Sequence, residues 1–592
     1  MSRISKKSKN IKTDWNLRGL FYRNEKDTQI AKDWQLTAAA YASFEKKYKS
    51  GNYLRSSKRL LESLQSYETL QTLPTAKAAY YFYYRKELNS GDQVAARELN
   101  KLEQALAKLE NSILFYEVGL ATLPPSKKRL YLKDKKLAHF HTFLRRIFAE
   151  GAHTLSVPEE KIMNLKSLPA RSLWISATEK ILNQRVVKVG RKELPIHGAL
   201  MGYMDKPIRE RHAIFDATAK VLESVAPVAE SELNAIYIDK KISDELRGYS
   251  LPYEATIQAY DQSIQSLDVL RSLITTRGYR LSNKFYTIKS KWLGRKLTFI
   301  DRSDGKTRLP VIEFEKAVDI CREVFYEVNE EYGRIFDTML CSGQIDVYPK
   351  KAKGGGAFCS SGVNLPTLVF LNQSDSLDGL RTLAHEMGHA IHAYRSKNQS
   401  PLYEGHSIAT AETASTFFEG LVVRRMIEKA SGKEKVELLN KYISDNLATI
   451  VMCIARFEIE LEFHNKVREG GELSWQDMQK IYCKHMKKFA GPDIEIRDKD
   501  GLHFIYKPHY RLNFYQYSYS FGSLMSNIML GRYLKNSDFR VELDQFLSAG
   551  ETLSVDEIFS SIDIDAGMQA TLEEGLSLLE QDMMEFAKLT RV

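Results

Sequence analysis

The residues most suited to chemistry lie in one short segment, the HEMGH sequence at residues 385–389. On an α-helix His385 and His389 stand about 40° apart, so both imidazoles leave one face, as two ligands of a single zinc ion must. Glu386 points about 80° away from that pair and can reach a zinc-bound water without being a ligand. The motif therefore predicts zinc-activated hydrolysis with Glu386 as the general base.

The segment around the motif has the pattern of a helix with one apolar face. Its apolar stripe lies roughly opposite the two histidines and comprises Leu380, Leu383, Met387, Ile391 and Tyr394. Either Asp375 or Ser376 can cap the start of this helix. The alternative is a surface helix with two unrelated histidines, and the cap and the stripe both argue against it.

A third zinc ligand must come from elsewhere, because catalytic zinc usually has three protein ligands and an open position for water. Glu412 opens a helix expected from about Ile408, and Glu404 competes from the preceding loop, so the residues alone leave the choice open. Glu419 shares a face with Glu412 and could accept a hydrogen bond from a ligand histidine. His392 is expected to pack or to support the ligands, because no glycine bend follows it.

Two further segments could contact a substrate. His and Tyr are dense in 502–522, and such donors near zinc would stabilise the oxyanion of a tetrahedral intermediate. Tyr515 and Tyr519 would share a helix face there. The alternative is that the segment is an aromatic core helix without a role in catalysis. The glycines at 354–356 would let a peptide backbone approach, with strand 367–371 as the edge on which it pairs; a plain flexible turn is the alternative.

The rest of the chain predicts a mainly α fold with a small β region just before the motif helix. Amphipathic helices follow one another from about residue 34 to 182, and the clearest begins at a cap on Asp92. The segment 185–195 is β-prone, contains a glycine and marks a hairpin or boundary. We therefore expect an N-terminal helical domain at 1–195 and a catalytic domain at 196–592.

Composition excludes several classes of protein. Hydrophobic residues make up 43% and charged residues 27% of the 592 residues, as in soluble globular proteins. The net charge is +11, but basic and acidic residues are interspersed, which argues against nucleic-acid binding. Residues 1–12 are basic without a following apolar run, so they predict no secretory signal, and no stretch is apolar enough for a membrane span. Five widely spaced cysteines without a CxxC pair favour the reducing cytoplasm.

Several of these segments together resemble a known family. HEMGHAIH, Gly405-His406 and AETASTFFE at 411–419 are similar to the thimet oligopeptidase and oligoendopeptidase F group of zinc metallopeptidases. Segments 15–22, 354–358 and 509–522 resemble the oligoendopeptidase F branch in particular. The resemblance implies a large helical ellipsoid of zincin type, cut by a deep channel with zinc at its floor, which would admit only short, unfolded peptides.

The resemblance also implies roles for individual residues. It assigns one Zn²⁺ per chain to His385, His389 and Glu412, in preference to Glu404. The resemblance also implies that His509, Tyr515 and Tyr519 contact the substrate and the transition state. Tyr517 could take the place of either tyrosine. An N,N,O site also binds cobalt or manganese, so the ligands alone do not select zinc.

The function expected from the sequence is thus that of a zinc-dependent endopeptidase that hydrolyses internal bonds of short, unstructured oligopeptides. Its partners would be peptide substrates, with no nucleic acid and no membrane, and the oligomeric state is left open. An exopeptidase such as a dipeptidyl carboxypeptidase could use the same zinc core. A non-catalytic helical scaffold that binds peptides or nucleic acid is the rival from another class, but a structural zinc needs a fourth ligand and no convincing one is present.

Overall fold

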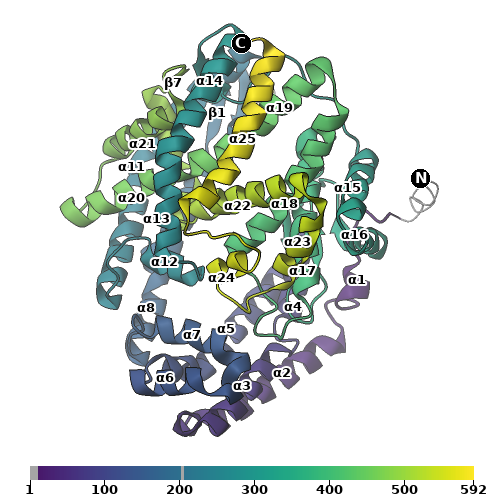
Figure 1. Cartoon of the computed structure of the whole chain (residues 1–592). Coiled ribbons are helices and arrows are strands. Elements are labelled where there is room, and N and C mark those ends of the chain that lie inside the picture. Colours follow the sequence, from purple (N-terminus) through teal and green to yellow (C-terminus); the bar gives the residue numbers. More distant parts are fainter. Residues whose placement is uncertain (1–10, 202–205) are drawn as a thin grey trace. The chain divides into compact units, whose positions relative to one another are not determined.

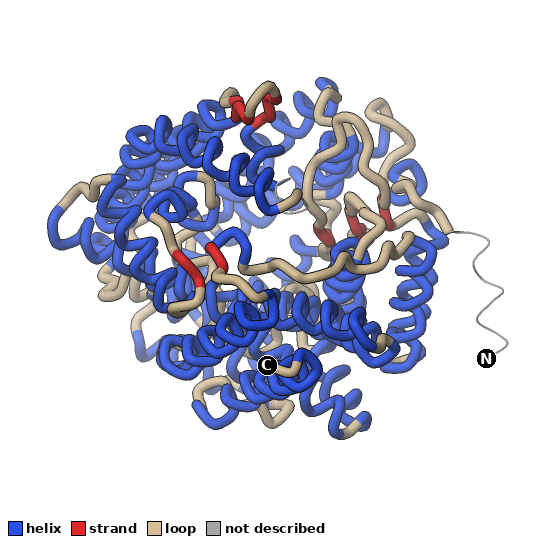
Figure 2. Tube along the Cα trace, turned by 90° about the horizontal axis from the view of Figure 1, so that it is seen from above, coloured by secondary structure: helices blue, strands red, loops and turns tan. Residues whose placement is uncertain are grey.

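A computed structural model describes residues 11–201 and 206–592 of the chain. The described residues are mainly helical, and Figure 2 shows how few strand segments interrupt the helices. The chain forms two compact units, and each is built from segments that lie far apart in sequence. The first unit comprises Met1–Thr154, Leu309–Met426 and Arg532–Ile564, and the second comprises Leu155–Arg308, Ile427–Gly531 and Asp565–Val592.

The expected mainly α fold is confirmed, and the helices and strands of each unit can be followed in Figure 1. Those of the first unit are α1 (Leu17–Leu20), α2 (Thr28–Tyr48), α3 (Ser57–Gln71), α4 (Lys77–Leu88), α5 (Gln93–Ala121), α6 (Pro125–Lys133), α7 (His141–Glu150), α15 (Phe314–Val328), α16 (Glu330–Ser342), β4 (Ile345–Asp346), β5 (Phe358–Ser360), β6 (Leu368–Phe370), α17 (Leu377–Ser396), most of α18 (Ile408–Lys429), α23 (Arg540–Ser548) and α24 (Val555–Ser560).

Those of the second unit are α8 (Val157–Ser167), α9 (Leu173–Asn183), β1 (Val186–Val189), β2 (Lys192–Pro195), α10 (Ile196–Met201), α11 (Ile208–Arg247), α12 (Glu254–Ala259), α13 (Ile264–Leu273), α14 (Tyr279–Leu293), β3 (Leu297–Thr298), α19 (Gly432–Asn446), α20 (Met452–Gly470), α21 (Trp475–Ala490), β7 (Ile494–Glu495), most of α22 (Tyr517–Lys535) and α25 (Gln569–Thr590). Residue 195 falls inside a segment of this unit, so the compact units do not separate there. Whether 1–195 and 196–592 behave as separate domains stays a prediction.

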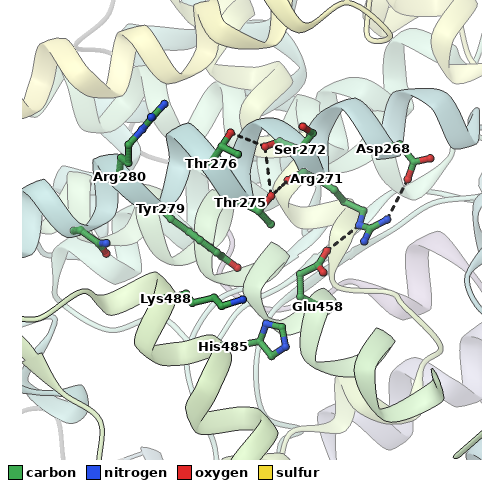
Figure 3. Close-up of a pocket in the computed structure, with 11 residues that line it drawn as sticks. Asp268, Arg271, Ser272, Thr275, Thr276, Tyr279, Arg280, Glu458, His485 and Lys488 are labelled. Carbon is green, nitrogen blue, oxygen red and sulfur yellow. Dashed lines mark hydrogen bonds and ion pairs between the residues drawn. The ribbon is translucent and has the colours of Figure 1, made fainter. Parts of the chain in front are cut away.

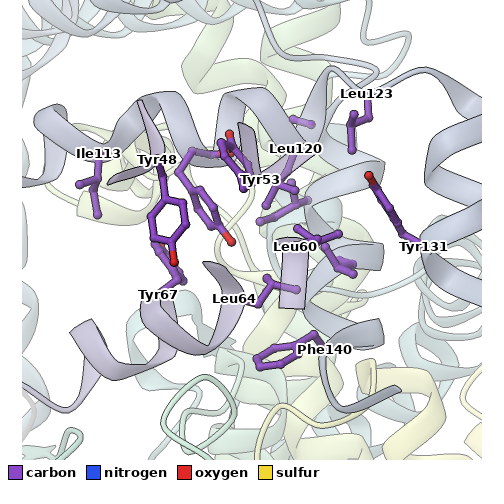
Figure 4. Close-up of a cluster of buried hydrophobic side chains, with 14 of the residues drawn as sticks. Tyr48, Tyr53, Leu60, Leu64, Tyr67, Ile113, Leu120, Leu123, Tyr131 and Phe140 are labelled. Atoms are coloured by element: carbon purple, nitrogen blue, oxygen red, sulfur yellow. The ribbon is translucent and has the colours of Figure 1, made fainter. Parts of the chain in front are cut away.

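Helix α5 forms part of the N-terminal core of the first unit. As predicted, Asp92 caps it by accepting a hydrogen bond from the backbone N–H of Ala95. Its residues Ile113, Tyr116 and Leu120 recur at three- and four-residue spacing and are buried in a cluster with side chains of α2, α3 and α7 (Figure 4). The apolar stripe of this helix therefore builds a helical bundle, as the sequence pattern indicates.

A three-stranded sheet lies beside α17 in the first unit, with the strand order β4-β6-β5. Strand β6 pairs in parallel with β4 and antiparallel with β5. The expectation that strand 367–371 offers an open edge is therefore wrong, because β6 has a neighbour on both sides. The edge strands of this sheet are β4 and β5, and on β5 Cys359 lies opposite Val369 of β6.

The glycine segment before β5 is held in place by hydrogen bonds. The Asn372 side chain donates to the carbonyls of Gly354 and Gly356 at 2.8 and 2.9 Å, and the N–H of Gly354 donates to the carbonyl of Glu87 at 2.7 Å. Gly356 adopts a positive φ of 76°, which only glycine reaches without strain. The segment is thus a fixed turn, and its use by a substrate stays a prediction.

Helices α17 and α18 approach each other closely at a glycine of the HExxH motif. A Cβ atom on Gly388 would lie 2.7 Å from the Cα of Ser415 and 3.1 Å from the carbonyl oxygen of Ala414. A methyl group at this position would push the two backbones apart. The small residues of both helices therefore fix the separation of the side chains that each helix carries.

The predicted hairpin before residue 195 is confirmed in the second unit. Strands β1 and β2 pair antiparallel, with Val187 opposite Leu194, and Gly190 turns the chain with a φ of 61°. Among residues 11–201 and 206–592, no helix combines the length and the apolar character that crossing a membrane demands.

Candidate metal centre

The HExxH helix begins where its sequence predicts. Ser376 caps α17 by accepting a hydrogen bond from the backbone N–H of Gly379 at 3.2 Å. Two turns further on, His385 and His389 project from one face with ring centroids 4.9 Å apart. The helix buries its other face, including Leu380, as the apolar stripe requires.

Glu412, the fifth residue of α18, meets the histidine pair. One nitrogen of His385, one of His389 and one carboxylate oxygen of Glu412 all lie within 4.8 Å of one another. The Nε2 atom of His385 is 3.5 Å from Oε2 of Glu412. Glu404 is absent from this group among the described residues, so the geometry favours Glu412 over its competitor as a third ligand.

Glu419 supports the group from the next turns of α18. Its Oε2 lies 3.1 Å from Nδ1 of His385, which confirms that Glu419 can accept a hydrogen bond from this histidine. Its other oxygen accepts from the Arg381 guanidinium, whose Nε donates at 2.9 Å. Burial raises the pKa of Glu419, but Arg381 and His385 outweigh it and hold the pKa at about 2, so Glu419 is an anion that orients the imidazole.

The donor set suits a divalent cation. Burial lowers the pKa of His385, but the hydrogen bond to Glu419 and the charges of Glu412 and Glu386 outweigh it and raise that pKa to about 9. Burial and then the charge of His385 keep the pKa of His389 well below its usual range, so His389 is neutral, as a metal ligand must be. The surroundings of His385 thus stabilise a positive charge. A metal ion bound here would supply that charge in place of the second proton of His385.

Glu386 lies beside this group and points to the sheet. It is 6% exposed, and burial raises its pKa to about 7 against the opposing charge of His385. The backbone N–H of Cys359 on β5 lies toward this carboxylate and favours its charged form. Glu386 therefore lies toward β5, whereas the two imidazoles of the same helix face Glu412.

Comparison with known proteins decides the family. The family model described as "Peptidase family M3" matches residues 303–578, and the model described as "Oligopeptidase F" matches residues 120–181. The chain belongs to peptidase family M3. The group at His385, His389 and Glu412 lies within the matched part, so this M3 metallopeptidase carries its candidate metal ligands where the family model applies.

Named relatives place this M3 chain in the oligoendopeptidase F group. It is 22% identical to oligopeptidase PepF of Bacillus subtilis over 92% of this chain and 82% of the relative. It is 24% identical to group B oligopeptidase PepB of Streptococcus agalactiae over 91% and 92%. A crystal structure of oligoendopeptidase F from Enterococcus faecium aligns with a TM-score of 0.71 at 19% identity, over 95% of this chain and 99% of that one.

The remaining predicted residues of the M3 chain lie together in the second unit. The ring of His509 is 6.0 Å from that of Tyr515 and 5.9 Å from that of Tyr519, and the two tyrosine rings are 5.3 Å apart. Tyr517 is buried and donates from its hydroxyl to Gln262 at 3.0 Å. Because α22 begins at Tyr517, the expectation that Tyr515 shares a helix face with Tyr519 is wrong, yet their rings meet.

His392 packs, as the sequence predicts. It is 1% exposed and stacks on His406 with ring centroids 4.3 Å apart, while Phe546 covers it at 5.6 Å. Two functional contacts escaped sequence reasoning. Arg381 precedes His385 by four residues, so helical spacing could have indicated it. The backbone N–H of Cys359 carries no sequence signal at all.

The Glu419 contact predicts a measurable effect on metal affinity. The Glu419→Gln substitution removes a negative charge, and the neutral amide would orient His385 less firmly. We therefore expect zinc to bind roughly 10–100-fold more weakly. Competition against a chromophoric chelator measures this. Glu327→Gln is the matched control, since Glu327 also pairs with an arginine, Arg425, but on α15. Equal affinity of wild type and Glu419→Gln would contradict the role assigned to Glu419.

Proposed function

We propose that this chain is a zinc endopeptidase that hydrolyses internal bonds of short, unstructured oligopeptides. The observation that carries the proposal is the approach of His385, His389 and Glu412 to within 4.8 Å, with Glu386 beside them. Three ligands leave a position open, which is typical of catalytic rather than structural zinc. Membership of family M3 supports peptides as the substrate class.

The residues divide the chemistry between them. A bound zinc ion would polarise the scissile carbonyl and lower the pKa of a water molecule. Glu386 takes the proton of that water and returns it to the leaving amine, so it acts first as base and then as acid. The N–H of Cys359 favours the charged form of Glu386, which is the form that accepts the proton. Glu419 keeps the proton of His385 on Nδ1 and so leaves Nε2 for the metal.

We place the extended substrate on β5 instead of β6, because β5 is an edge strand of its sheet and, unlike the other edge strand β4, follows the glycine segment 354–356. Pairing along β5 would recognise the main chain of the peptide and demand little of its side chains. The deep channel implied by the family resemblance stays part of this proposal, and so does the preference for short peptides. A cytoplasmic location is also proposed, in keeping with five free cysteines.

His509, Tyr515 and Tyr519 are proposed to donate hydrogen bonds to the oxyanion and the substrate. For Tyr519→Phe we expect kcat to fall by roughly 10²-fold with little change in KM, because the lost hydroxyl would act mainly in the transition state. Tyr517→Phe is the control, since it removes a buried hydrogen bond to Gln262 and should lower the melting temperature without this loss of kcat. An unchanged kcat in Tyr519→Phe and Tyr515→Phe would contradict the assignment.

Peptides blocked at both termini test the endopeptidase function. Mass spectrometry of products, together with metal analysis of the protein, should show internal cleavage of the blocked peptides and zinc in stoichiometric amount. An exopeptidase would cleave only unblocked peptides. Salt-sensitive DNA binding without any turnover of peptides would instead support a scaffold that binds nucleic acid.

A further inference from the structure

Several partly or fully buried arginine side chains of the second unit form ion pairs with carboxylates. In a cavity of about 780 Å³, Arg271 donates to Glu458 at 2.9 Å and to Asp268 at 3.1 Å (Figure 3). Arg511 binds both oxygens of Glu232 at 2.7 Å each. This is the usual arrangement, because a cation removed from water is costly unless an anion accompanies it.

Two cations close to His509 depart from this arrangement. Arg456 lies on α20, two residues before Glu458, and Lys507 precedes Pro508; both are only partly exposed. Neither forms an ion pair with a carboxylate among the described residues. The groups acting on the Arg456 guanidinium are phenols and a thiol, those of Tyr482, Tyr510, Tyr506 and Cys453.

The charged groups around the Lys507 ammonium also include more cations than anions. Its Nζ lies 5.6 Å from the ring centroid of Tyr506. Burial, and then the positive charges of Arg456 and Arg302, lower the pKa of Lys507 to about 7. Burial and then Arg456 and Lys507 lower the pKa of His509 to about 4, so this imidazole is neutral and the two cations lie near it.

The same region carries hydrogen-bonding groups with no partner. Nε of Arg456, Nδ1 of His509 and Nε2 of His503 are buried and make no hydrogen bond with described residues, and the same holds for the hydroxyl of Tyr510. Two of these side chains, those of His503 and Tyr510, are themselves at most 4% exposed. A built group of donors with excess positive charge and no carboxylate is suited to an anion supplied from outside.

We propose that Arg456 and Lys507 form an anion subsite beside His509 that binds a carboxylate of the peptide substrate. This proposal rests on the proposed function, which identifies the substrate as a peptide. A carboxylate can come from the C-terminus of the peptide or from an acidic side chain, and guanidinium and ammonium groups bind both.

Binding to the Glu386→Gln chain tests the subsite without turnover. Three labelled peptides of one sequence are compared by fluorescence anisotropy: the free acid, the C-terminal amide, and the amide with glutamate as its last residue. We expect the free acid to bind at least tenfold more tightly than the plain amide. If the glutamate peptide regains this affinity, an acidic side chain also fills the subsite.

Variants locate the effect. In Arg456→Met and in Lys507→Met the advantage of the acid over the amide should fall to less than threefold, while the amide itself binds as before. Arg456→Lys should keep most of the advantage, and so should Lys487→Met, an exposed lysine on α21. Because no ion pair is lost, the melting temperatures of the methionine variants should equal or exceed that of the parent.

Two results would overturn the subsite: equal affinity for acid and amide in the parent, or an advantage that survives in both methionine variants. Cleavage by the wild-type chain is measured in parallel with the same peptides. Absence of all cleavage would sink the proposed function but leave the carboxylate dependence of binding as an independent result.

Discussion

Replacing Glu386 with glutamine should lower kcat for a short peptide by a factor of roughly 10²–10⁴, the usual contribution of a general base. The amide keeps the shape of the side chain but cannot take a proton from water. The barrier would rise by about 3–5 kcal/mol. A quenched-fluorescent peptide measures the loss, and the change should appear in kcat with little effect on KM.

Metal content separates this effect from damage to the site. Glu386 is outside the group formed by His385, His389 and Glu412, so the variant should retain as much zinc as the wild type. Glu103→Gln, an exposed carboxylate on α5, controls for the loss of one charge. Full activity in a Glu386→Gln chain that holds its metal would show that another group is the base.

Glu412→Gln should have the opposite signature, with loss of metal as the primary event. Binding of zinc at a structural protein site is worth about 10–16 kcal/mol, so one ligand of three or four accounts for about 2.5–5 kcal/mol. Affinity should therefore fall by roughly 10²–10⁴-fold, and activity should be lost after dialysis. Inductively coupled plasma spectrometry of the dialysed protein checks the metal content.

The matched control is Glu404→Gln, since Glu404 was the competing carboxylate and lies on the loop before α18. It should keep both zinc and activity. Excess zinc should partly restore Glu412→Gln but never Glu386→Gln, because only the first variant is limited by metal occupancy. If Glu404→Gln loses its metal and Glu412→Gln does not, the third ligand has been assigned to the wrong residue.

The site could be predicted from the sequence as far as local spacing reaches. His385 and His389 share a face because helical geometry fixes it, and the capping residue Ser376 follows from the same local rules. Glu419 could be paired with a ligand histidine for a related reason, since it lies on the same face of α18 as Glu412. The shared face in each case depends on positions within one helix, although the contact of Glu419 with His385 joins α18 to α17.

Inferences that crossed from one element to another were less secure. Strand 367–371 was expected to be an edge, but β4 pairs with it on one side and β5 on the other. Tyr515 was expected on the same helix as Tyr519, but α22 begins two residues later, and the rings meet through a turn of the chain. In both cases the local pattern was compatible with several arrangements of neighbouring elements.

The sequence alone determined the mainly helical fold, the HExxH helix and its two imidazoles, because hydrophobic periodicity and capping act over a few residues. Residue spacing left Glu412 and Glu404 open as the third ligand, and only the tertiary structure brings Glu412 to that pair and Cys359 of β5 close to Glu386. Those contacts depend on how closely two helices and a strand pack, which Gly388 and its neighbours set through sterics that no spacing rule encodes.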